Sequence, residues 1–542
     1  MPIDKKDLTS PPDLQSHGKG TGPKRDQKPI YVDFLPPCNN ACPAGENIQA
    51  WLSLVRVEQY EAAWQKLIED NPMPAIHGRV CYHPCESSCN RTSIDSTVSI
   101  HAVERFLGDM AIKEGWKVPV PKKKSGKKIL IIGAGPSGLS AAYHLTRLGH
   151  TVEIHEAGPV AGGMMHFGIP SYRLPREELN AEIRRIEEMG VKIVLNHKVE
   201  NVLAEKEAGN FDAVFIAVGA HISQKVDIPA RDAGQIIDAL TFLKGVEHGN
   251  APKLGRKVAI YGGGNTAMDA ARVAKRLGYE PLIIYRRDRE HMPAHDFEAA
   301  EALSEGVKIN WLRTIKEIDH STFKVEIMRI ENGRPVGTGE YEDLDADSLI
   351  LALGQNTDTG FLRDIPGIEF DRDGTVIVSE AMMTGYEGIF AGGDMVPSER
   401  TVTIAVGHGK KAARHIDAYL REKTWQKEAK HPIVGFERLH MWYQTEAPQK
   451  EQIHKEPEIR VRDFTEVVAG LTNTEAKYEA MRCLSCGNCF ECDGCFSACP
   501  EDAIIKLGPG KRYAYNYNAC TGCAVCYEQC PCHAIEMIDE EA

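Results

Sequence analysis

Apolar residues in the middle of the chain form short runs that alternate with longer helical patterns. The run KILII at 128–132 is followed by LSAAYHLTRLG, and the next run, TVEIHE, ends at Glu156. The same order returns at 257–287 as KVAIY, MDAARVAKRLG and PLIIYRR. Short apolar runs separated by helices of this length are typical of parallel sheets built from strand–helix–strand units. The pattern therefore predicts two doubly wound α/β units.

The turn after the first strand carries a glycine motif. It is made of Gly133, Gly135, Pro136, Ser137 and Gly138. Glycines allow a tight turn and close backbone approach to a pyrophosphate, which binds at the positive end of the following helix. Glu156 lies 23 residues after Gly133, where a carboxylate accepts hydrogen bonds from a ribose. Strand, glycines, helix, strand and acid in this order predict a dinucleotide site.

The second unit repeats the glycine motif but not the acid. Its turn contains Gly262, Gly264, Asn265 and Thr266. The position 23 residues after Gly262 is Tyr285, followed by Arg286 and Arg287. Guanidinium groups bind a 2′-phosphate well, whereas a carboxylate would repel it. This favours NADPH over NADH, although two solvated arginines at a strand end would leave NADH possible.

Three further segments fit the scheme of two nucleotide-binding units. FDAVFIAVG at 211–219 and SLILALG at 348–354 read as strands that end in glycine. A later strand ends in Gly393 and Asp394 and precedes a helix rich in small residues. The segment resembles the family of two-domain flavoproteins, in which this Gly-Asp pair holds the FAD and the nicotinamide domain is inserted in the FAD domain. A helix N-cap is the alternative role for Asp394.

Length, charge and hydropathy narrow the class of protein. A chain of 542 residues suggests three or four domains at ~100–200 residues each. No apolar run reaches the ~18–20 residues of a membrane helix, and the net charge of −13 argues against a general nucleic-acid binder. The first 36 residues are polar, without the apolar stretch of a signal peptide. We therefore expect a flexible arm there and a cytoplasmic protein.

The cysteines gather at the two ends of the chain. There are 16, and none lies between Cys89 and Cys483. In a large chain without a secretion signal, metal or cluster ligation is favoured over a disulfide scaffold. The gap leaves no Cys-x-x-Cys beside the flavin, which excludes a thioredoxin-reductase-like dithiol mechanism within this chain.

The C-terminal cysteines follow the pattern of a two-cluster bacterial ferredoxin. They form two runs of four, Cys489 to Cys499 and Cys520 to Cys530. In such proteins the first three cysteines of one run and the last cysteine of the other run ligate one [4Fe–4S] cluster. One predicted set is Cys489, Cys492, Cys495 and Cys530. The other is Cys520, Cys523, Cys526 and Cys499. A zinc knuckle is the alternative, and Cys532 is left over as a structural residue.

Two longer segments resemble a narrower family. AGGMMHFGIPSYRLPREEL at 161–179, which contains Gly163 and Met164, and YRRDREHMPAHDFE at 285–298 are similar to the small chain of glutamate synthase and its relatives. These relatives include subunits of ferredoxin transhydrogenases and the N-terminal half of dihydropyrimidine dehydrogenase. The likeness covers residues 36–420. It implies a helical iron–sulfur domain before the flavoprotein core.

The resemblance also implies ligands in that domain. It suggests one cluster on Cys42, Cys81, Cys85 and Cys89. Cys38 is then left without partner cysteines. In the family, a characteristic N-terminal segment leads to a Cys-x2-Cys pair, and here a similar segment lies at 460–487, at the other end of the chain. We therefore expect Cys483 and Cys486 to fold back to Cys38, with Glu104 as fourth ligand. The alternatives are redundant cysteines and an ordinary surface acid on a helix.

The predicted fold is a multidomain α/β protein. It has an N-terminal helical iron–sulfur domain, a Rossmann-like flavoprotein core with two dinucleotide-binding domains, and a C-terminal α+β bacterial ferredoxin domain. The expected boundaries are a flexible arm at 1–36, the helical [4Fe–4S] domain at 37–122, the FAD domain at 123–250 and 359–420, the NAD(P) domain at 251–358, a polar linker at 421–482 and the ferredoxin domain at 483–542.

Electron transfer is the function that these cofactors imply. A nicotinamide delivers two electrons as hydride and a cluster takes one, so FAD is needed to convert between them. No side chain is nominated for acid–base work on an organic substrate. We expect an NAD(P)H-linked subunit that serves a 2-oxoacid:ferredoxin oxidoreductase, a reductase complex or a glutamate synthase large chain. A free-standing NAD(P)H:ferredoxin oxidoreductase and a redox sensor or scaffold are the alternatives.

Overall fold

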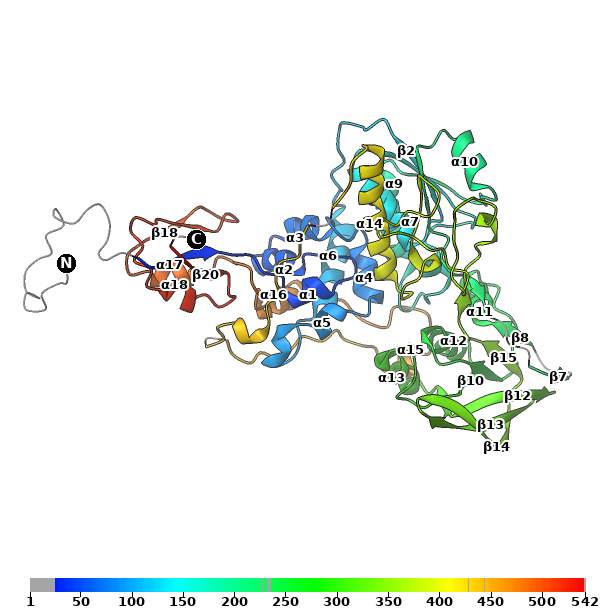
Figure 1. Cartoon of the computed structure of the whole chain (residues 1–542). Coiled ribbons are helices and arrows are strands. Elements are labelled where there is room, and N and C mark those ends of the chain that lie inside the picture. The colour runs from blue at the N-terminus through cyan, green and yellow to red at the C-terminus, as the bar shows by residue number, and fades with distance from the viewer. Residues whose placement is uncertain are drawn as a thin grey trace, which may run out of the picture.

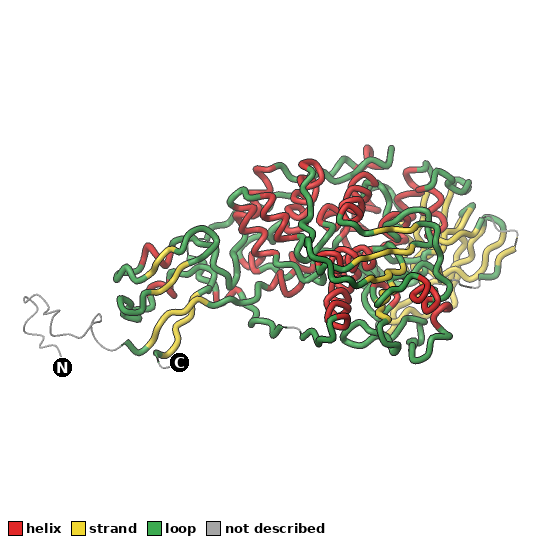
Figure 2. Tube along the Cα trace, turned by 90° about the horizontal axis from the view of Figure 1, so that it is seen from above, coloured by secondary structure: helices red, strands yellow, loops and turns green. Residues whose placement is uncertain are grey.

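The computed structural model describes residues 25–224, 226, 228–231, 235–426, 428–442 and 444–540. These residues form an elongated molecule (Figure 1). A small unit that contains the end of the chain lies at one tip, helices occupy the middle, and two α/β units form the other end. The view from above in Figure 2 keeps the same order of units along the long axis. No helix among the described residues is long and apolar enough to cross a membrane.

The first α/β unit is built on a five-stranded parallel sheet in the order β17-β5-β2-β3-β4. Its strands are nearly all buried because helices cover the sheet. The strands are β2 Lys128–Ile132, β3 Thr151–His155, β4 Lys192–Val194, β5 Ala213–Ile216 and β17 Ile389–Ala391. The helices are α7 Pro136–Arg147, α8 Met164–Phe167, α9 Arg176–Glu188, α10 Val202–Ala208 and α14 Val402–Leu420. We call this part the FAD unit, after the prediction.

The second α/β unit, the NADP unit, is inserted between β5 and β17 of the first. It has a parallel sheet in the order β11-β10-β9-β15-β8 and a mainly antiparallel sheet in the order β14-β13-β12-β7. The strands are β6 Ile222–Ser223, β7 Ala230–Arg231, β8 Ile236–Asp238, β9 Lys257–Tyr261, β10 Glu280–Tyr285, β11 Lys308–Trp311, β12 Arg313–Asp319, β13 Thr322–Glu331, β14 Arg334–Asp345, β15 Ser348–Leu351 and β16 Gln355–Asn356. The helices are α11 Ala239–Glu247, α12 Asn265–Arg276 and α13 Asp296–Ser304.

A helical unit lies between the FAD unit and the end of the chain. Its helices are α1 Pro37–Ala41, α2 Ile48–Arg56, α3 Tyr60–Leu67, α4 Pro74–Val80, α5 Pro84–Ser87 and α6 Ile100–Glu114. The buried tryptophans Trp51 and Trp64 belong to the same hydrophobic core as the strands β2 and β3. The Tyr143 hydroxyl on α7 also donates to the Ile68 carbonyl at 2.7 Å. The helical unit and the FAD unit are therefore packed as one body.

The C-terminal unit uses both ends of the chain. Strand β1 Gln27–Tyr31 pairs antiparallel with β20 Ile535–Asp539, and Arg25 forms an ion pair with Glu540. The remaining elements are α17 Gly494–Ala498, β18 Ile504–Lys506, β19 Tyr513–Tyr515 and α18 Val525–Glu528. This corrects the prediction of a flexible arm for residues 25–36. The partner strand lies about 500 residues away in sequence, so no local pattern could reveal it. Residues 1–24 of the predicted arm lie outside the described residues.

The described residues of 421–482, the segment predicted as a polar linker, pack against other units. Phe464 and Val467 pack into the core of the NADP unit, and Val467 N–H donates to the Tyr172 carbonyl at 3.1 Å. The segment includes α15 Pro457–Arg460 and α16 Asn473–Arg482, and α16 begins with a capping box made by Thr472 and Glu475. It thus runs along the NADP and helical units on its way to the C-terminal cysteines.

Two glycines let α4 and α6 cross at close range. A Cβ at Gly108 on α6 would lie 2.2 Å from the Ala75 nitrogen, and one at Gly78 on α4 would lie 2.4 Å from the Arg105 nitrogen. Both distances are far below van der Waals contact. This crossing orders the helices that carry Cys81 and Glu104, because Cys81 directly follows α4 and Glu104 lies on α6.

We predict that Gly108→Ala lowers the stability of the protein. The added methyl gains up to about 1 kcal/mol in helix propensity but forces the crossing apart, and overpacking costs about 1–3 kcal/mol. The urea midpoint, followed by far-UV circular dichroism, should fall. Gly360→Ala is the matched control, because its Cβ would lie 3.8 Å from the nearest atom. Equal midpoints for the two variants would show that the crossing tolerates a side chain.

Candidate nucleotide and cluster sites

The first glycine turn leaves room for a phosphate group. Gly133 has φ +102°, and a Cβ there would lie 2.4 Å from the Ala217 carbonyl oxygen. A Cβ at Gly138 would lie 2.0 Å from the Gly133 carbonyl oxygen. Gly135, in contrast, faces open space, with no atom within 4 Å of an added Cβ. The turn therefore packs tightly against the sheet at Gly133 and Gly138 but leaves space at Gly135. This space lies where α7 begins with Pro136 and Ser137.

Glu156 follows β3 and lies against this turn. Its Oε2 accepts from the Ala134 N–H at 2.8 Å and its Oε1 from the Gly158 N–H at 2.7 Å. These two bonds fix the carboxylate at the mouth of the glycine turn. The position suits a carboxylate that accepts hydrogen bonds from a ribose.

Gly163, Met164, Gly393 and Asp394 come from other loops of the FAD unit. Gly163, next to Met164 at the start of α8, has φ +54°, and its Cβ would lie 3.0 Å from the Gly135 Cα. A Cβ at Gly393 would lie 3.0 Å from the Ser137 Cβ. Burial raises the pKa of Asp394 to about 6. The N-cap of α14 is Thr401, whose side chain accepts from the Ile404 N–H, so the alternative role of Asp394 as the cap of this helix is wrong.

The second glycine turn has the same construction. A Cβ at Gly262 would lie 2.2 Å from the Ala352 carbonyl oxygen, whereas Gly264 faces open space. Helix α12 begins at Asn265, followed by Thr266. Asn265 donates to the Tyr82 hydroxyl at 2.6 Å and accepts from the His295 N–H at 3.1 Å. Tyr82 was not predicted, and it brings the helical unit to the nucleotide turn.

The two predicted phosphate-binding arginines follow β10. Arg286 is exposed and Arg287 is half-buried. The buried Nε of Arg287 has no hydrogen-bond partner among the described residues. A guanidinium with unused donors at this strand end fits a phosphate monoester.

Cys38, Cys89, Cys483 and Cys486 form one group. Burial raises the pKa of the Cys38 thiol, and the nearby Cys89, Cys483 and Cys486 raise it further. Asn90 donates to the Cys486 sulfur at 3.3 Å and the Ser485 N–H to the Cys483 sulfur at 3.4 Å. The C-terminal pair therefore does fold back to Cys38. Four neighbouring cysteine sulfurs, two of which accept N–H hydrogen bonds, form a ligand set suited to a [4Fe–4S] cluster.

Cys42, Cys81 and Cys85 form a second group with Glu104. Burial raises the pKa of Cys81 to about 12, and the nearby Glu104 raises it too. The predicted grouping had Cys89 here and Glu104 beside Cys38, so the structure exchanges these two residues. The reason lies in α5, which ends at Ser87. Cys89 is in extended conformation after this end and so does not share a helical face with Cys85.

Glu104 is not an ordinary surface acid. It is 6% exposed and its Oε1 accepts from Asn71 at 2.6 Å. Asn71 also donates to Glu46 at 3.0 Å, and burial raises the pKa of Glu46 to about 7. Glu46 lies near the Cys42 sulfur and forms a backbone hydrogen bond with it. The prediction missed Glu46, although its place four residues after Cys42 was a signal.

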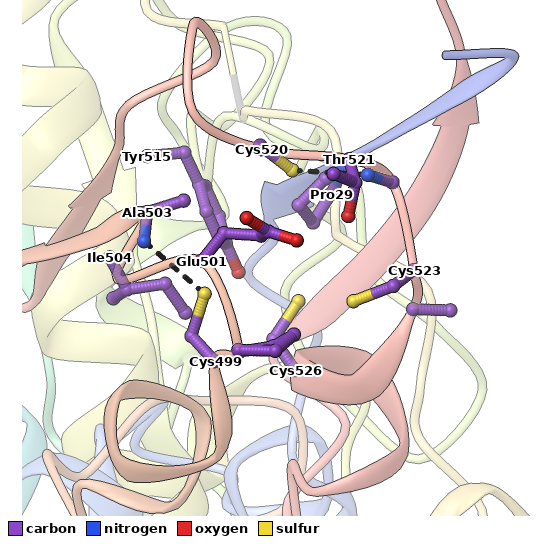
Figure 3. A pocket seen from close by; sticks show the side chains of 13 residues that line it. Pro29, Cys499, Glu501, Ala503, Ile504, Tyr515, Cys520, Thr521, Cys523 and Cys526 are labelled. Atoms are coloured by element: carbon purple, nitrogen blue, oxygen red, sulfur yellow. Dashed lines mark hydrogen bonds between the residues drawn. The ribbon is translucent and has the colours of Figure 1, made fainter. Parts of the chain in front are cut away.

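The ferredoxin cysteines lie in the two sets that their spacing predicts. Cys530 lies close to Cys489, Cys492 and Cys495 and raises the pKa of each thiol, after the larger effect of burial. Cys499, Cys520, Cys523 and Cys526 line one pocket, and Figure 3 shows their sulfurs turned toward a common space. The Ala503 and Gly522 N–H groups donate to two of these sulfurs at 3.3 and 3.4 Å. The set fits a cubane cluster better than a zinc ion, because each run exchanges its last cysteine with the other.

Cys532 is a buried fifth cysteine beside the first ferredoxin set. Its sulfur lies 3.9 Å from the Cys530 sulfur. The loop that carries Cys532 also contacts the segment after Cys483 and Cys486, because the Gly487 N–H donates to the Cys532 carbonyl at 2.6 Å. Cys532 therefore ties the ferredoxin unit to the segment that carries Cys486.

Comparison with known proteins agrees with this geometry. The family model for pyridine nucleotide-disulphide oxidoreductases matches residues 127–409, more than half of the chain. The model for dihydropyrimidine dehydrogenase domain II, a 4Fe-4S cluster domain, matches residues 34–116. These matches cover the FAD, NADP and helical units.

Three curated relatives extend over most of the chain. The NADP(+)-dependent formate dehydrogenase subunit beta of Moorella thermoacetica is 36% identical over 84% of this chain and 71% of its own length. The NADPH-Fe(3+) oxidoreductase subunit beta of Geobacter sulfurreducens is 31% identical over 84% and 76%. The glutamate synthase [NADPH] small chain of Azospirillum brasilense is 31% identical over 72% and 87%.

The predicted fold class, oxidoreductase activity and resemblance to the glutamate synthase small chain are confirmed by these matches. The predicted cofactors FAD, NADP(H) and [4Fe–4S] are confirmed at the level of the family. The chain belongs to the pyridine nucleotide-disulphide oxidoreductase family and is an NAD(P)H-dependent iron–sulfur flavoprotein.

Proposed function

We propose that this protein takes electrons from NADPH at a bound FAD and passes them through four [4Fe–4S] clusters to a partner subunit in the cytoplasm. The observation that carries the proposal is the order of the cysteine groups. They form a series that begins beside the FAD unit and ends at the far tip of the molecule. The following contacts define this series.

The first step joins the FAD unit to the group of Cys42, Cys81 and Cys85. The Thr403 side chain at the start of α14 contacts the Cys81 sulfur. A Cβ at Gly407 on the same helix would lie 2.2 Å from the Pro43 carbonyl oxygen, so α14 lies directly against the residue after Cys42. Lys410, one turn on, donates to the Ala44 carbonyl at 2.8 Å. This cysteine group is therefore held at a fixed place beside the FAD unit.

The second step joins the two cysteine groups of the helical unit. Cys85 lies in one group, yet the nearby Cys42, Cys81 and Cys38 all raise its thiol pKa, after burial and Glu86. Cys38 belongs to the other group. Cys38 lies in the short helix α1 and Cys42 directly follows its end, so about one turn of helix separates a ligand of each proposed cluster.

The third step crosses from the helical unit to the ferredoxin unit. Cys486 and Cys489, from different groups, are three residues apart. Arg56, at the end of α2, lies near both Cys483 and Cys492 and lowers the pKa of each thiol, against burial. Its guanidinium stacks on the Phe490 ring at 4.6 Å. A positive charge between two anionic clusters favours the reduced state of both.

The last step lies inside the ferredoxin unit. The helix α17 separates Cys495 of one set from Cys499 of the other, and α18 separates Cys526 from Cys530. Cys492 and Cys523 are exposed, so both sets approach the surface at this tip. The names of the relatives include subunits of a formate dehydrogenase and of a glutamate synthase, which supports delivery to another chain at this end.

The chemistry expected of the cofactors follows from their electron count. FAD, when bound, accepts a hydride and releases single electrons. The residues proposed to hold it are Gly133, Gly135, Pro136, Ser137, Gly138, Glu156, Gly163, Met164, Gly393 and Asp394. Those proposed to hold NADPH are Gly262, Gly264, Asn265, Thr266, Arg286 and Arg287. These residues bind and orient, and none of them needs to transfer a proton to a substrate.

The direct test is an anaerobic titration of the whole protein with NADPH, and separately with NADH. We expect NADPH to bleach both flavin and cluster absorbance within the mixing time of a stopped-flow experiment. Bleaching of the flavin alone would contradict a connected series of clusters. Full reduction of added soluble ferredoxin by the isolated chain would favour the free-standing oxidoreductase over the subunit, and no bleaching at all would favour the scaffold.

Arg287→Ala should weaken the binding of NADPH but not that of NADH. A lost charge-assisted hydrogen bond of about 1.5–3 kcal/mol corresponds to an increase of roughly 10- to 100-fold in the KM for NADPH, with the KM for NADH little changed. Arg289→Ala is the control, because Arg289 is an exposed arginine in the same loop. An equal increase in the KM for NADPH and for NADH would show that the guanidinium does not bind the 2′-phosphate.

Cys483→Ser should remove one cluster and leave the ferredoxin clusters in place. We expect a loss of about four irons per chain, with the electron paramagnetic resonance signals of the two ferredoxin clusters retained. Cys532→Ser, a buried cysteine outside the proposed ligand sets, should keep its full iron content. Unchanged iron in Cys483→Ser would rule out the fold-back cluster while leaving nucleotide binding untouched.

A further inference from the structure

Three ligand-type side chains meet in the FAD unit, and none of them belongs to a proposed cluster ligand set. They are His155 at the end of β3, His197 in the loop after β4, and Glu205 on α10. One ligand atom of each lies within 4.8 Å of the ligand atoms of the other two. The three residues come from separate elements, so the fold and not a local sequence motif brings them together.

The distances suit a common ion. The Glu205 Oε1 lies 3.0 Å from the His155 Nδ1 and 3.0 Å from the His197 Nε2. Ligands bound to zinc at about 2.0–2.1 Å in tetrahedral geometry lie roughly 3.3–3.4 Å apart. The two imidazole rings are 4.4 Å apart and tilted by 59°. They are thus not stacked, and a small movement would bring the three atoms to a tetrahedral spacing.

The buried imidazole of His155 is not satisfied by hydrogen bonds on this side. His155 is 6% exposed. Its Nδ1 makes no hydrogen bond of acceptable geometry, although the Glu205 oxygen is 3.0 Å away. A buried polar atom without a partner is costly. An ion bound by both atoms would remove this cost.

The opposite nitrogen of His155 has the partner that metal-bound histidines usually have. The His155 Nε2 lies 3.0 Å from the Glu153 Oε1. The Glu153 carboxylate is held in turn by Lys192, also at 3.0 Å. A carboxylate on the outer nitrogen fixes the tautomer and orientation of a metal-bound imidazole and raises its basicity. Glu153 therefore leaves the Nδ1 of His155 free to bind an ion.

We propose that His155, His197 and Glu205 bind a divalent transition-metal ion, with Zn²⁺ the best fit. Two imidazoles and one carboxylate suit zinc, whereas Mg²⁺ and Ca²⁺ require mainly oxygen ligands. The His197 side chain is 40% exposed, so water can complete the tetrahedron. The site does not depend on the proposed electron path, because it shares no residue with it.

Such an ion would stiffen the loop behind Glu156. The His197 N–H donates to the Glu156 carbonyl at 2.8 Å and the Asn196 N–H to the Gly158 carbonyl at 2.9 Å. A metal bond to His197 would hold this loop against β3 and α10. The ion is therefore a structural clamp on the residue proposed to hold the FAD ribose.

The test uses the whole protein with its clusters and flavin, freed of loosely bound metal with a chelator and kept anaerobic. We expect calorimetric titration with Zn²⁺ to show one site per chain. Zinc K-edge X-ray absorption should give a shell of nitrogen and oxygen at about 2.0–2.1 Å and no sulfur at about 2.3 Å. A sulfur shell, or no bound zinc, would overturn the proposal.

Matched variants separate the site from other zinc ligands. His197→Ala and Glu205→Gln should weaken this binding at least 100-fold, and Glu153→Gln about 10- to 100-fold. His320→Ala is the control, because His320 is an exposed histidine whose Nδ1 pairs with Asp319 at 2.9 Å. Equal affinity in His197→Ala and in the wild type would assign the zinc elsewhere. Since His197 lies near the surface, this variant should fold normally, which the flavin spectrum will check.

Discussion

One buried guanidinium fastens the C-terminal segment to the helical unit. Arg482, the last residue of α16, is 3% exposed. It donates to the Thr97 and Ser96 carbonyls at 2.7 Å each, to Asp95 at 3.0 Å and to the Ala447 carbonyl at 2.9 Å, and it also pairs with Glu479 at 2.8 Å. A buried charge is stable only when it is paired and fully hydrogen-bonded. Here every donor direction is used, so α16 has a single position.

That position decides where the following residues go. Cys483 comes directly after Arg482, and Cys486 one turn later, so both reach Cys38 and Cys89 from across the helical unit. The Asp95 carboxylate shares the same network, and its pKa is lowered, first by its hydrogen bond with Arg91. The return of the chain therefore depends on charge pairing as well as on apolar packing. It also places the ferredoxin unit at the tip, because only a few residues separate Cys486 from Cys489.

The sequence predicts those parts of the fold that depend on residues close together in the chain. The strand–glycine–helix order around Gly133 and Gly262 is local, and the structure has those elements where the pattern places them. The two ferredoxin sets also follow from spacing alone. The pairing of β1 with β20 and the sheet of β12 to β14 went unpredicted, because their stability comes from contacts between distant strands or from long hairpins without a nucleotide motif.

The grouping of the N-terminal cysteines shows the same limit within one site. The family resemblance suggested that Cys85 and Cys89, four residues apart, share a cluster. The helix ends at Ser87, and this end turns Cys89 toward the fold-back pair. Glu104 then faces Cys42 and Cys81, beside the unforeseen Glu46. A sequence indicates which residues can be ligands, but the end of a four-residue helix decides which cluster each would serve.

Contacts from outside its own sheet help to hold the NADP unit in place, and they come from the helical unit, the FAD unit and the returning segment. The Tyr82 ring stacks on His295 at 3.7 Å, and its hydroxyl accepts from Asn265 at the nucleotide turn. Arg173, from the FAD unit, pairs with Asp269 and Glu298 of the NADP unit. Val467 from the returning segment packs into its core. Hydride transfer requires the nicotinamide and flavin rings to meet in one orientation. Since Tyr82 directly follows Cys81, the residue that accepts a hydrogen bond from the nucleotide turn is joined to a ligand of the first cysteine group.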